Sequence, residues 1–344
     1  MKLTKPPKLN PGDKIAAVSL SWGCAGEPKY SWRYNLGVSR LKSEFGLEAV
    51  AMPHSLKGDE YLSSHPEARA EDFMAAFADP SINGIIANIG GNDSIRLLPY
   101  IDFRVIRNNP KVFIGYSDIM SCHLMCLKAG LSSFYGANLL TTVAEPQGMH
   151  PYSRYWLHKT LFDSRPIGHV AHPDVFTCDE TEYANPNQIK QFHAHAHTGY
   201  ECIQGSGKVT GRLFGGHTLV ATDHIHLFTE TIEKKEDVIL FIEEIVECVS
   251  PDIFADFFRR LHGEGYMRNV KGLIIGRFNE YPENPGFRTA LLRVMNELGL
   301  SGLPVLYNAP FGHSSPICVM PYGAMAEIDC DNVTFCISES GVVD

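Results

Sequence analysis

The stretch Phe113-Ile114-Gly115-Tyr116-Ser117-Asp118-Ile119 carries the strongest fold signal in the chain. A short apolar run ends at a glycine, a serine follows two residues later, and a helix-like segment continues through Leu127. This order predicts a strand, a tight turn and a helix, with the serine at the helix mouth. Such a serine can act as a nucleophile, because N–H groups at a helix start favour developing negative charge. It can equally be a helix N-cap, and both interpretations stay open at this point.

Strands and helices alternate along the first part of the chain. Strands are predicted at Lys14–Leu20, Leu47–Met52, Ile82–Ile89 and Val112–Ile114, and helices at Tyr30–Phe45 and Pro66–Ala78. This rhythm predicts an α/β fold with a mostly parallel sheet. In such sheets functional groups gather in the loops beyond the carboxyl ends of the strands. Both Gly90-Gly91 and Ser117 fall at that edge.

The second part of the chain begins with a change of character near Ala144. Pro146–Arg165 and the His- and Gly-rich residues Gly168–Gly207 are interpreted as a crossing segment with extended loops. Order then returns, with strands predicted at Val209–Phe214, Val238–Ile242, Val270–Ile275 and Pro304–Leu306, helices at Pro251–His262 and Arg288–Leu298, and a closing hairpin from Met325–Asp329 and Val333–Ile337. We therefore expect a nucleophile domain at 1–165 and a second domain at 166–344.

Composition excludes several classes of protein. The 344 residues carry a net charge of −9, which argues against a nucleic-acid polymer as partner. No apolar run is long enough for a membrane span, and no export signal is recognised, so we expect a cytoplasmic protein without a membrane partner. The nine cysteines are scattered without a C-x-x-C pair, which predicts reduced thiols. Cys122 and Cys126 are interpreted as helix packing.

Three further motifs at predicted strand exits complement Ser117. Gly90-Gly91 is either a tight turn or a backbone that points N–H groups at an oxyanion. Glu243 ends an apolar strand and is either a solvated acid or a carboxylate that orients a histidine. His313 lies in a loop between Gly312 and Pro316, where a general base is more common than on a buried helix face. Together these residues supply the nucleophile, base, orienter and oxyanion donors of a serine hydrolase.

A competing hypothesis places a metal at His193, His195 and His197. Alternate residues of a strand share a face, so three imidazoles could bind one zinc ion, with Asp223, His224 and His226 as further ligands. No glutamate lies at a known metallohydrolase spacing, and we predict that the enzyme works without a metal. A ligand-binding module without catalysis is the remaining alternative.

Several separated motifs, in order, resemble the LD-carboxypeptidase family of serine peptidases over nearly the whole chain. The similarity is greatest to the branch that contains the microcin C self-immunity carboxypeptidase. The motifs are Ile89-Gly90-Gly91-Asn92-Asp93-Ser94, Leu97–Asp102, Gly115-Tyr116-Ser117-Asp118, Phe134-Tyr135-Gly136, Gly211–Gly216, Leu240–Glu244 and Gly312-His313-Ser314-Ser315-Pro316.

The resemblance implies a Ser117–Glu243–His313 triad, with the backbone N–H groups of Gly91 and Asp118 as the oxyanion hole. It implies a Rossmann-like or flavodoxin-like N-terminal domain with a parallel sheet and a smaller C-terminal α/β domain, with the active site in the cleft between them. It also implies a homodimer and no metal or other cofactor.

The resemblance further implies a small-molecule substrate, with Gly90 and Asn92 among the residues that bind it. The leading candidate is a peptidyl- or aminoacyl-nucleotide of the microcin C type, and the alternative is the murein tetrapeptide of cell-wall recycling. Two departures concern this specificity. His217 stands where the branch usually has a substrate-binding asparagine. The loop that elsewhere offers a tryptophan to the nucleotide base has no tryptophan here, and Tyr183 or Phe176 could stack instead.

Overall fold

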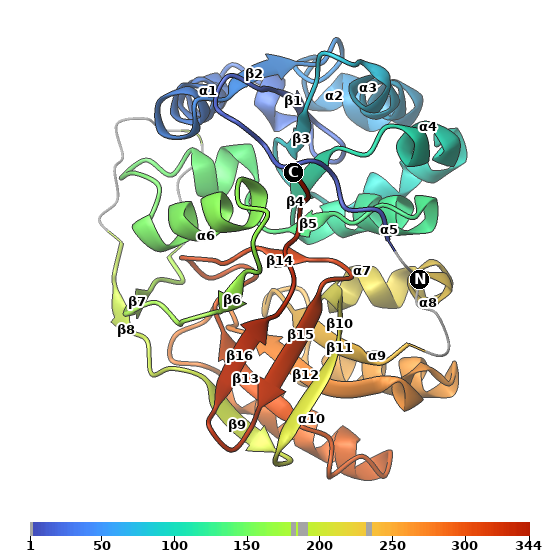
Figure 1. Ribbon diagram of the computed structural model, residues 1–344, viewed down its shortest axis with the longest axis vertical. Helices are drawn as coiled ribbons and strands as arrows, with labels where there is room; N and C mark the ends of the chain where they lie inside the picture. Colours follow the sequence, from blue (N-terminus) through green and yellow to red (C-terminus); the bar gives the residue numbers. More distant parts are fainter. Residues whose placement is uncertain (1–2, 180–183, 185–191, 232–235) are drawn as a thin grey trace. The chain divides into compact units, whose positions relative to one another are not determined.

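Parallel strands form the sheet that leads to Ser117 (Figure 1). The computed structural model describes residues 3–179, 184, 192–231 and 236–344. Strands β5, β4, β3, β1 and β2 lie side by side in that order, and each pairs in parallel with its neighbours. Their bounds are β1 Lys14–Val18, β2 Glu48–Ala51, β3 Gly84–Ala87, β4 Val112–Gly115 and β5 Phe134–Tyr135.

Helices flank this sheet and bury its central strands. They are α1 Ser31–Phe45, α2 Asp59–Ser64, α3 Pro66–Ala78, α4 Phe103–Asn108, α5 Met120–Ala129 and α6 Pro151–Leu161, with short helical turns η1 Cys24–Gly26, η2 Ser94–Tyr100, η3 Ser117–Ile119 and η4 Leu139–Val143. Every residue of β3 and β4 is buried, as expected of parallel strands covered on both faces. Phe73 and Phe77 of α3 join Phe113 of β4 in one apolar core.

A second sheet holds eight strands in the order β6-β16-β15-β10-β11-β12-β13-β9. Its centre, β10 to β13, is parallel, and the strands on either side are antiparallel. The bounds are β6 Gly168–His169, β9 Glu201–Gln204, β10 Lys208–His217, β11 Val238–Glu243, β12 Val270–Gly276, β13 Val305–Ala309, β15 Met325–Asp329 and β16 Thr334–Ile337. The remaining elements are β7 Val175–Phe176, β8 His195–Ala196, β14 Met320–Pro321, α7 Thr218–Asp223, α8 Ile225–Glu230, α9 Pro251–Gly263, α10 Pro285–Glu297 and η5 Tyr266–Arg268.

The described residues divide into two compact units. One holds residues 3–164 with 184, 192 and the chain end 341–344, and the other holds 165–179, 193–231 and 236–340. The chain end joins the first unit through backbone hydrogen bonds, in which Lys8 N–H donates to the Val343 carbonyl over 2.8 Å. The expected division into a nucleophile domain at 1–165 and a second domain at 166–344 stays a prediction.

The α/β architecture and the parallel sheet expected from the sequence are confirmed. So is the closing hairpin, in which β15 and β16 pair antiparallel. Two interpretations were wrong or incomplete. Residues 151–161, in the part interpreted as a crossing segment with extended loops, form helix α6, and α7 and α8 lie where no element was expected. Short, weakly periodic helices such as these take their stability from packing against neighbours.

All nine cysteines are free thiols, and Cys122 and Cys126 are buried in α5, as expected. Burial raises the pKa of both thiols, which suits a packing role and not a redox one. Among the described residues, no helix combines the length and apolar character that crossing a membrane requires.

Candidate active site

Ser117 occupies a strained turn directly after β4. Its φ of 67° lies in the left-handed region, which costs a non-glycine residue roughly 1–2 kcal/mol. Its N–H donates to the Tyr135 hydroxyl over 3.0 Å. The N-cap position of η3 belongs to Tyr116, and an N-cap has extended backbone angles, so the helix-cap interpretation of Ser117 is wrong. A strained serine between a strand and a helix is the geometry of a nucleophile elbow.

The Gly90-Gly91 loop lies against this turn because neither residue has a side chain. A Cβ on Gly90 would lie 2.9 Å from the Ser117 Cβ. A Cβ on Gly91, whose φ is +157°, would lie 2.2 Å from the Ser21 hydroxyl. Trp22 N–H donates to the Gly90 carbonyl over 3.1 Å, which holds the loop in place. Gly90 therefore presents backbone, and not side chain, to the elbow, and Gly91 does the same to Ser21.

The side chain of Asp118 ties three strand-exit loops together. Its carboxylate accepts the Ser21 hydroxyl over 2.6 Å and the Ser94 N–H over 2.8 Å. The Ser94 hydroxyl donates to the Asp118 carbonyl over 2.6 Å. These bonds join the exits of β1 and β3 to the elbow after β4. Sequence reasoning assigned a role only to the Asp118 N–H and missed this structural role of its carboxylate.

Arg69 of α3 also holds these loops in place, and its role was not predicted from the sequence. Its fully buried guanidinium donates to the carbonyls of Leu20 and Ser21 over 3.2 Å each. It also forms a two-pronged pair with Asp93, over 2.6 and 3.0 Å. The fork geometry explains why an arginine is used here, because it satisfies two loops at once.

A pocket of about 410 Å³ opens beside the Gly90-Gly91 loop. Its lining includes Trp22, Asp59, Gly91 and Asn92, all in the unit that carries Ser117. Asn92, a predicted substrate-binding residue, is exposed there. The pocket is large enough for part of a small-molecule substrate.

His123 of α5 fixes the end of β4 and is fully buried. Its Nε2 lies 2.9 Å from the Gly115 carbonyl, and its Nδ1 lies 2.9 Å from the Ser133 hydroxyl. Since a carbonyl can only accept, Nε2 carries the proton and Nδ1 accepts from the serine. Burial lowers the pKa of His123 to about 3, so the ring is neutral in the folded protein.

The neutral His123 predicts a loss of stability in acid. Unfolded histidine binds a proton below about pH 6.5, whereas folded His123 does so only near pH 3. Between these values the unfolded state binds more protons, so the free energy of unfolding falls as pH falls. At about pH 5 this loss amounts to about 2 kcal/mol. His123→Asn removes the titrating ring, so the variant should not show this loss. The free energy of unfolding of the variant should therefore fall below that of the wild type by about 2 kcal/mol less at pH 5 than at about pH 7.5. Urea unfolding at both pH values measures this, and an unchanged deficit would contradict it.

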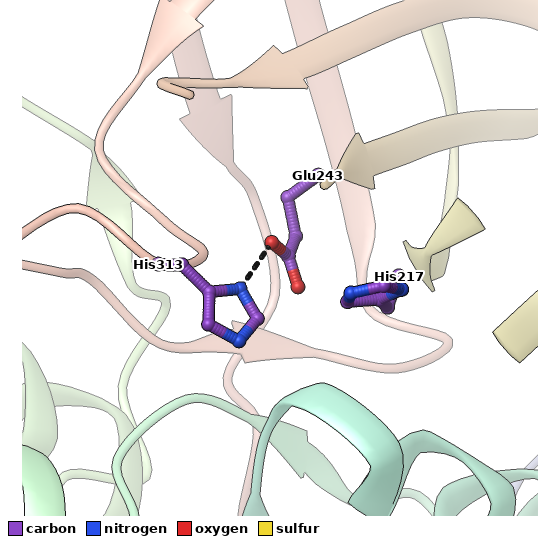
Figure 2. Close-up of side chains that lie close together, drawn as sticks. All are labelled: His217, Glu243 and His313. Atoms are coloured by element: carbon purple, nitrogen blue, oxygen red, sulfur yellow. Dashed lines mark hydrogen bonds and ion pairs between the residues drawn. The ribbon is translucent and has the colours of Figure 1, made fainter. Parts of the chain in front are cut away.

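In the other unit, Glu243 and His313 form a hydrogen-bonded pair (Figure 2). Glu243 is the last residue of β11, and His313 lies in the loop after β13. The His313 Nδ1 lies 2.7 Å from the Glu243 Oε2, and the Glu243 side chain is 1% exposed against 16% for His313. The carboxylate makes Nδ1 the protonated nitrogen, so Nε2 is the one that can accept a proton.

Gly312 brings the histidine loop close enough for this bond. Its φ is +100°, and a Cβ there would lie 2.8 Å from the Glu243 Oε2. A side chain at this position would therefore push against the carboxylate that His313 needs. Gly312 is therefore needed for the hydrogen bond between His313 and Glu243, and not only for the turn.

His217 and Glu244 form a second histidine–carboxylate pair beside the first. His217, the last residue of β10, is paired in register with Glu243 of β11. Its Nε2 lies 3.0 Å from Glu244 Oε1, and both side chains are buried. The His217 ring centroid lies 5.6 Å from that of His313. Glu244 was not singled out from the sequence, although it directly follows Glu243.

The structure groups the predicted site residues by unit. Ser117, Asp118, Gly90, Gly91 and Asn92 come together in the first unit, and His217, Glu243 and His313 in the second. Tyr183 lies outside the described residues.

Of the two aromatic residues expected to stack on a nucleotide base, the structure describes only Phe176, and it does not leave that ring open for stacking. Phe176 is buried, and the Arg277 guanidinium covers its ring at 3.2 Å. Tyr281 is an exposed ring near Phe176, at 56% exposure, and it stacks on His195 with centroids 3.7 Å apart. Tyr281 was missed because no sequence pattern distinguishes it.

The histidine run does not form the metal site that was considered. His193 is exposed and bonded to Asp179, His195 stacks on Tyr281, and His197 is buried against His172. Within the described part of the chain, these imidazoles form no group whose donor atoms could hold one ion.

Comparisons with known proteins identify relatives along almost the whole chain. Two family models match, the LD-carboxypeptidase N-terminal domain over residues 15–136 and the LD-carboxypeptidase C-terminal domain over residues 210–328. The chain is 29% identical to the microcin C7 self-immunity protein MccF of Escherichia coli, covering 89% of this chain and 88% of that protein. It is 27% identical to a Bacillus subtilis protein named "Probable murein peptide carboxypeptidase", covering 98% and 95%.

Solved structures agree with these relatives. An MccF-like protein from Streptococcus pneumoniae, solved in complex with AMP, matches with a TM-score of 0.84 at 30% identity, covering 95% of this chain and 99% of that one. MccF in complex with glutamyl sulfamoyl guanosine matches with a TM-score of 0.85 at 26% identity, covering 98% and 99%.

Proposed function

The chain belongs to the LD-carboxypeptidase family and is a serine-type carboxypeptidase, and on that premise we propose that Ser117, His313 and Glu243 are its catalytic triad. The observation that carries the proposal is the hydrogen bond of 2.7 Å between His313 and the buried Glu243. A buried carboxylate that fixes the tautomer of an imidazole is the arrangement a serine nucleophile requires. The strained turn at Ser117 supports the same assignment.

In the proposed mechanism, the nucleophile domain at 1–165 supplies Ser117, and residues 166–344 supply the base and its carboxylate. His313 Nε2 accepts the Ser117 proton as the hydroxyl attacks the scissile carbonyl. The N–H groups of Gly91 and Asp118 donate to the oxyanion. His313 then protonates the leaving amine, and water hydrolyses the acyl-enzyme by the same route.

We further propose that the substrate is an aminoacyl- or peptidyl-nucleotide conjugate. The support comes from relatives, because an MccF-like protein was solved with AMP and MccF with a sulfamoyl nucleotide. The exposed ring of Tyr281, held against His195, supplies a surface on which a base could stack. The murein peptide is the competing substrate, since a relative of similar identity carries that name.

Parallel assays test the substrate. The purified enzyme is given glutamyl sulfamoyl adenosine and the murein tetrapeptide, and kcat/KM is measured for each by the amino acid released. We expect the nucleotide conjugate to give the higher value, by about tenfold or more, because stacking of a base is worth about 1–3 kcal/mol. A higher value for the tetrapeptide would overturn the proposed substrate and leave the triad proposal standing.

A matched variant sharpens this comparison. Tyr281→Ala should lower kcat/KM for the nucleotide conjugate by about tenfold or more and leave the value for the tetrapeptide unchanged. An equal loss on both substrates would show that Tyr281 acts on the fold and not on the base.

A further inference from the structure

His217, Glu243 and His313 bring three potential metal ligands to one point (Figure 2). One donor atom from each lies within 4.8 Å of the other two. No other set of three or more His, Cys, Asp or Glu residues meets this condition in the described ranges 3–179, 192–231 and 236–344. Figure 2 shows the Glu243 carboxylate with an imidazole on either side. All three residues belong to one unit, so the cluster does not depend on how the two units are arranged.

Glu244 gives this cluster an outer carboxylate. Its Oε1 lies 3.0 Å from His217 Nε2, and its Oε2 accepts the Leu219 N–H over 3.0 Å. Histidines that bind metals usually donate their other ring N–H to a carboxylate, which fixes the ring and makes it a better ligand. Because Nε2 of His217 faces Glu244, Nδ1 is the nitrogen suited to bind an ion.

We propose that His217, Glu243 and His313 bind one Zn²⁺ ion and that the bound ion inhibits the enzyme. Two imidazole nitrogens and one carboxylate oxygen are ligands that Zn²⁺ prefers, at bond lengths of about 2.0–2.2 Å. Tetrahedral bonds of that length place donors about 3.3 Å apart, so the cluster must contract by about 1.5 Å at most. Glu243 Oε2 and His313 Nδ1 already lie 2.7 Å apart, so the contraction concerns the distance from His217 to this pair.

The bound ion would inhibit hydrolysis because it occupies the lone pair of the His313 imidazole. A neutral imidazole has one lone pair, so a His313 that binds the ion cannot accept a proton from Ser117. If the bond forms through Nδ1, the ring proton moves from Nδ1 to Nε2 by exchange with solvent, and the protonated Nε2 has no lone pair left to accept the Ser117 proton. The binding claim stands on the cluster alone, whereas the inhibition claim rests on the proposed function of His313.

Direct binding measurements test the site without relying on activity. Zn²⁺ is titrated into chelator-treated full-length protein by calorimetry, and Co²⁺ is titrated separately and followed by its visible absorption, which is strong in tetrahedral sites. We expect one ion per chain. His217→Asn should weaken binding by about 100-fold or more, and Glu244→Gln by about 10–100-fold, since outer carboxylates are worth that factor. Urea unfolding confirms that both variants fold.

The control is the double variant His193→Asn/His195→Asn, which removes imidazoles from the histidine run outside the cluster. It should bind Zn²⁺ with wild-type affinity. Binding that was lost in this control and kept in His217→Asn would overturn the site, as would the absence of any binding. Inhibition of wild-type hydrolysis should follow the same Zn²⁺ dependence as binding. Stoichiometric binding with undiminished activity would refute the inhibition, and the activity of Ser117→Ala tests the triad separately.

Discussion

Ser117→Ala is expected to lower kcat by about 10⁶-fold, the loss seen when a triad serine is removed from subtilisin. The methyl group cannot attack the carbonyl, and no acyl-enzyme can form. The oxyanion donors and the substrate contacts remain, so KM should change little. Single-turnover assays on the nucleotide conjugate, with enzyme in excess, measure losses of this size.

Ser153→Ala is the matched control for this variant. Ser153 is a buried serine of α6 in the same unit, with no role in the proposed mechanism. It should keep wild-type kcat. If Ser117→Ala kept activity within about tenfold of the wild type, another nucleophile would have to exist, since loss of a nucleophile costs far more.

Glu243→Gln is expected to lower kcat by about 10⁴-fold, the second largest effect. The glutamine amide can donate to His313 Nδ1, which would leave the proton on Nε2. A protonated Nε2 cannot accept the Ser117 proton, although the geometry is kept. The effect is smaller than that of Ser117→Ala because the nucleophile and oxyanion donors remain. Steady-state hydrolysis rates at neutral pH measure it.

Glu236→Gln provides the comparison for Glu243. Glu236 lies just before the opposite end of β11 and pairs with Arg212 over 2.8 Å. The substitution Glu236→Gln should leave kcat unchanged. Equal effects of the two substitutions would indicate a general weakening of β11 and would remove the special role of Glu243.

The elements that could be predicted from the sequence are those with strong local patterns. Helix α3 was bounded correctly because Pro66 marks its first turn and its apolar spacing is regular. β11 and β12 were recognisable as apolar runs, and their exits led to Glu243. Gly115, two residues before Ser117, and Gly312, directly before His313, likewise marked turns. These signals are local, because each depends on a few consecutive residues.

What could not be predicted depends on contacts between distant residues. Nothing near Arg69 indicates that its guanidinium holds the loop at Asp93. The role of His123 needs the Gly115 carbonyl beside it, which only the packing of α5 on β4 provides. Glu244 was overlooked because its partner His217 comes from another strand. Register and packing decide such pairs, and a single sequence records neither.

Covalent labelling tests the central claim most directly. The wild type and Ser117→Ala are treated with a fluorophosphonate, which forms a stable bond only with an activated serine, and the labelled peptide is identified by mass spectrometry. We predict one label per chain, on Ser117, with much slower labelling in His313→Ala and none in Ser117→Ala. A label on a different residue, or an actively hydrolysing enzyme that takes no label, would contradict Ser117 as the nucleophile.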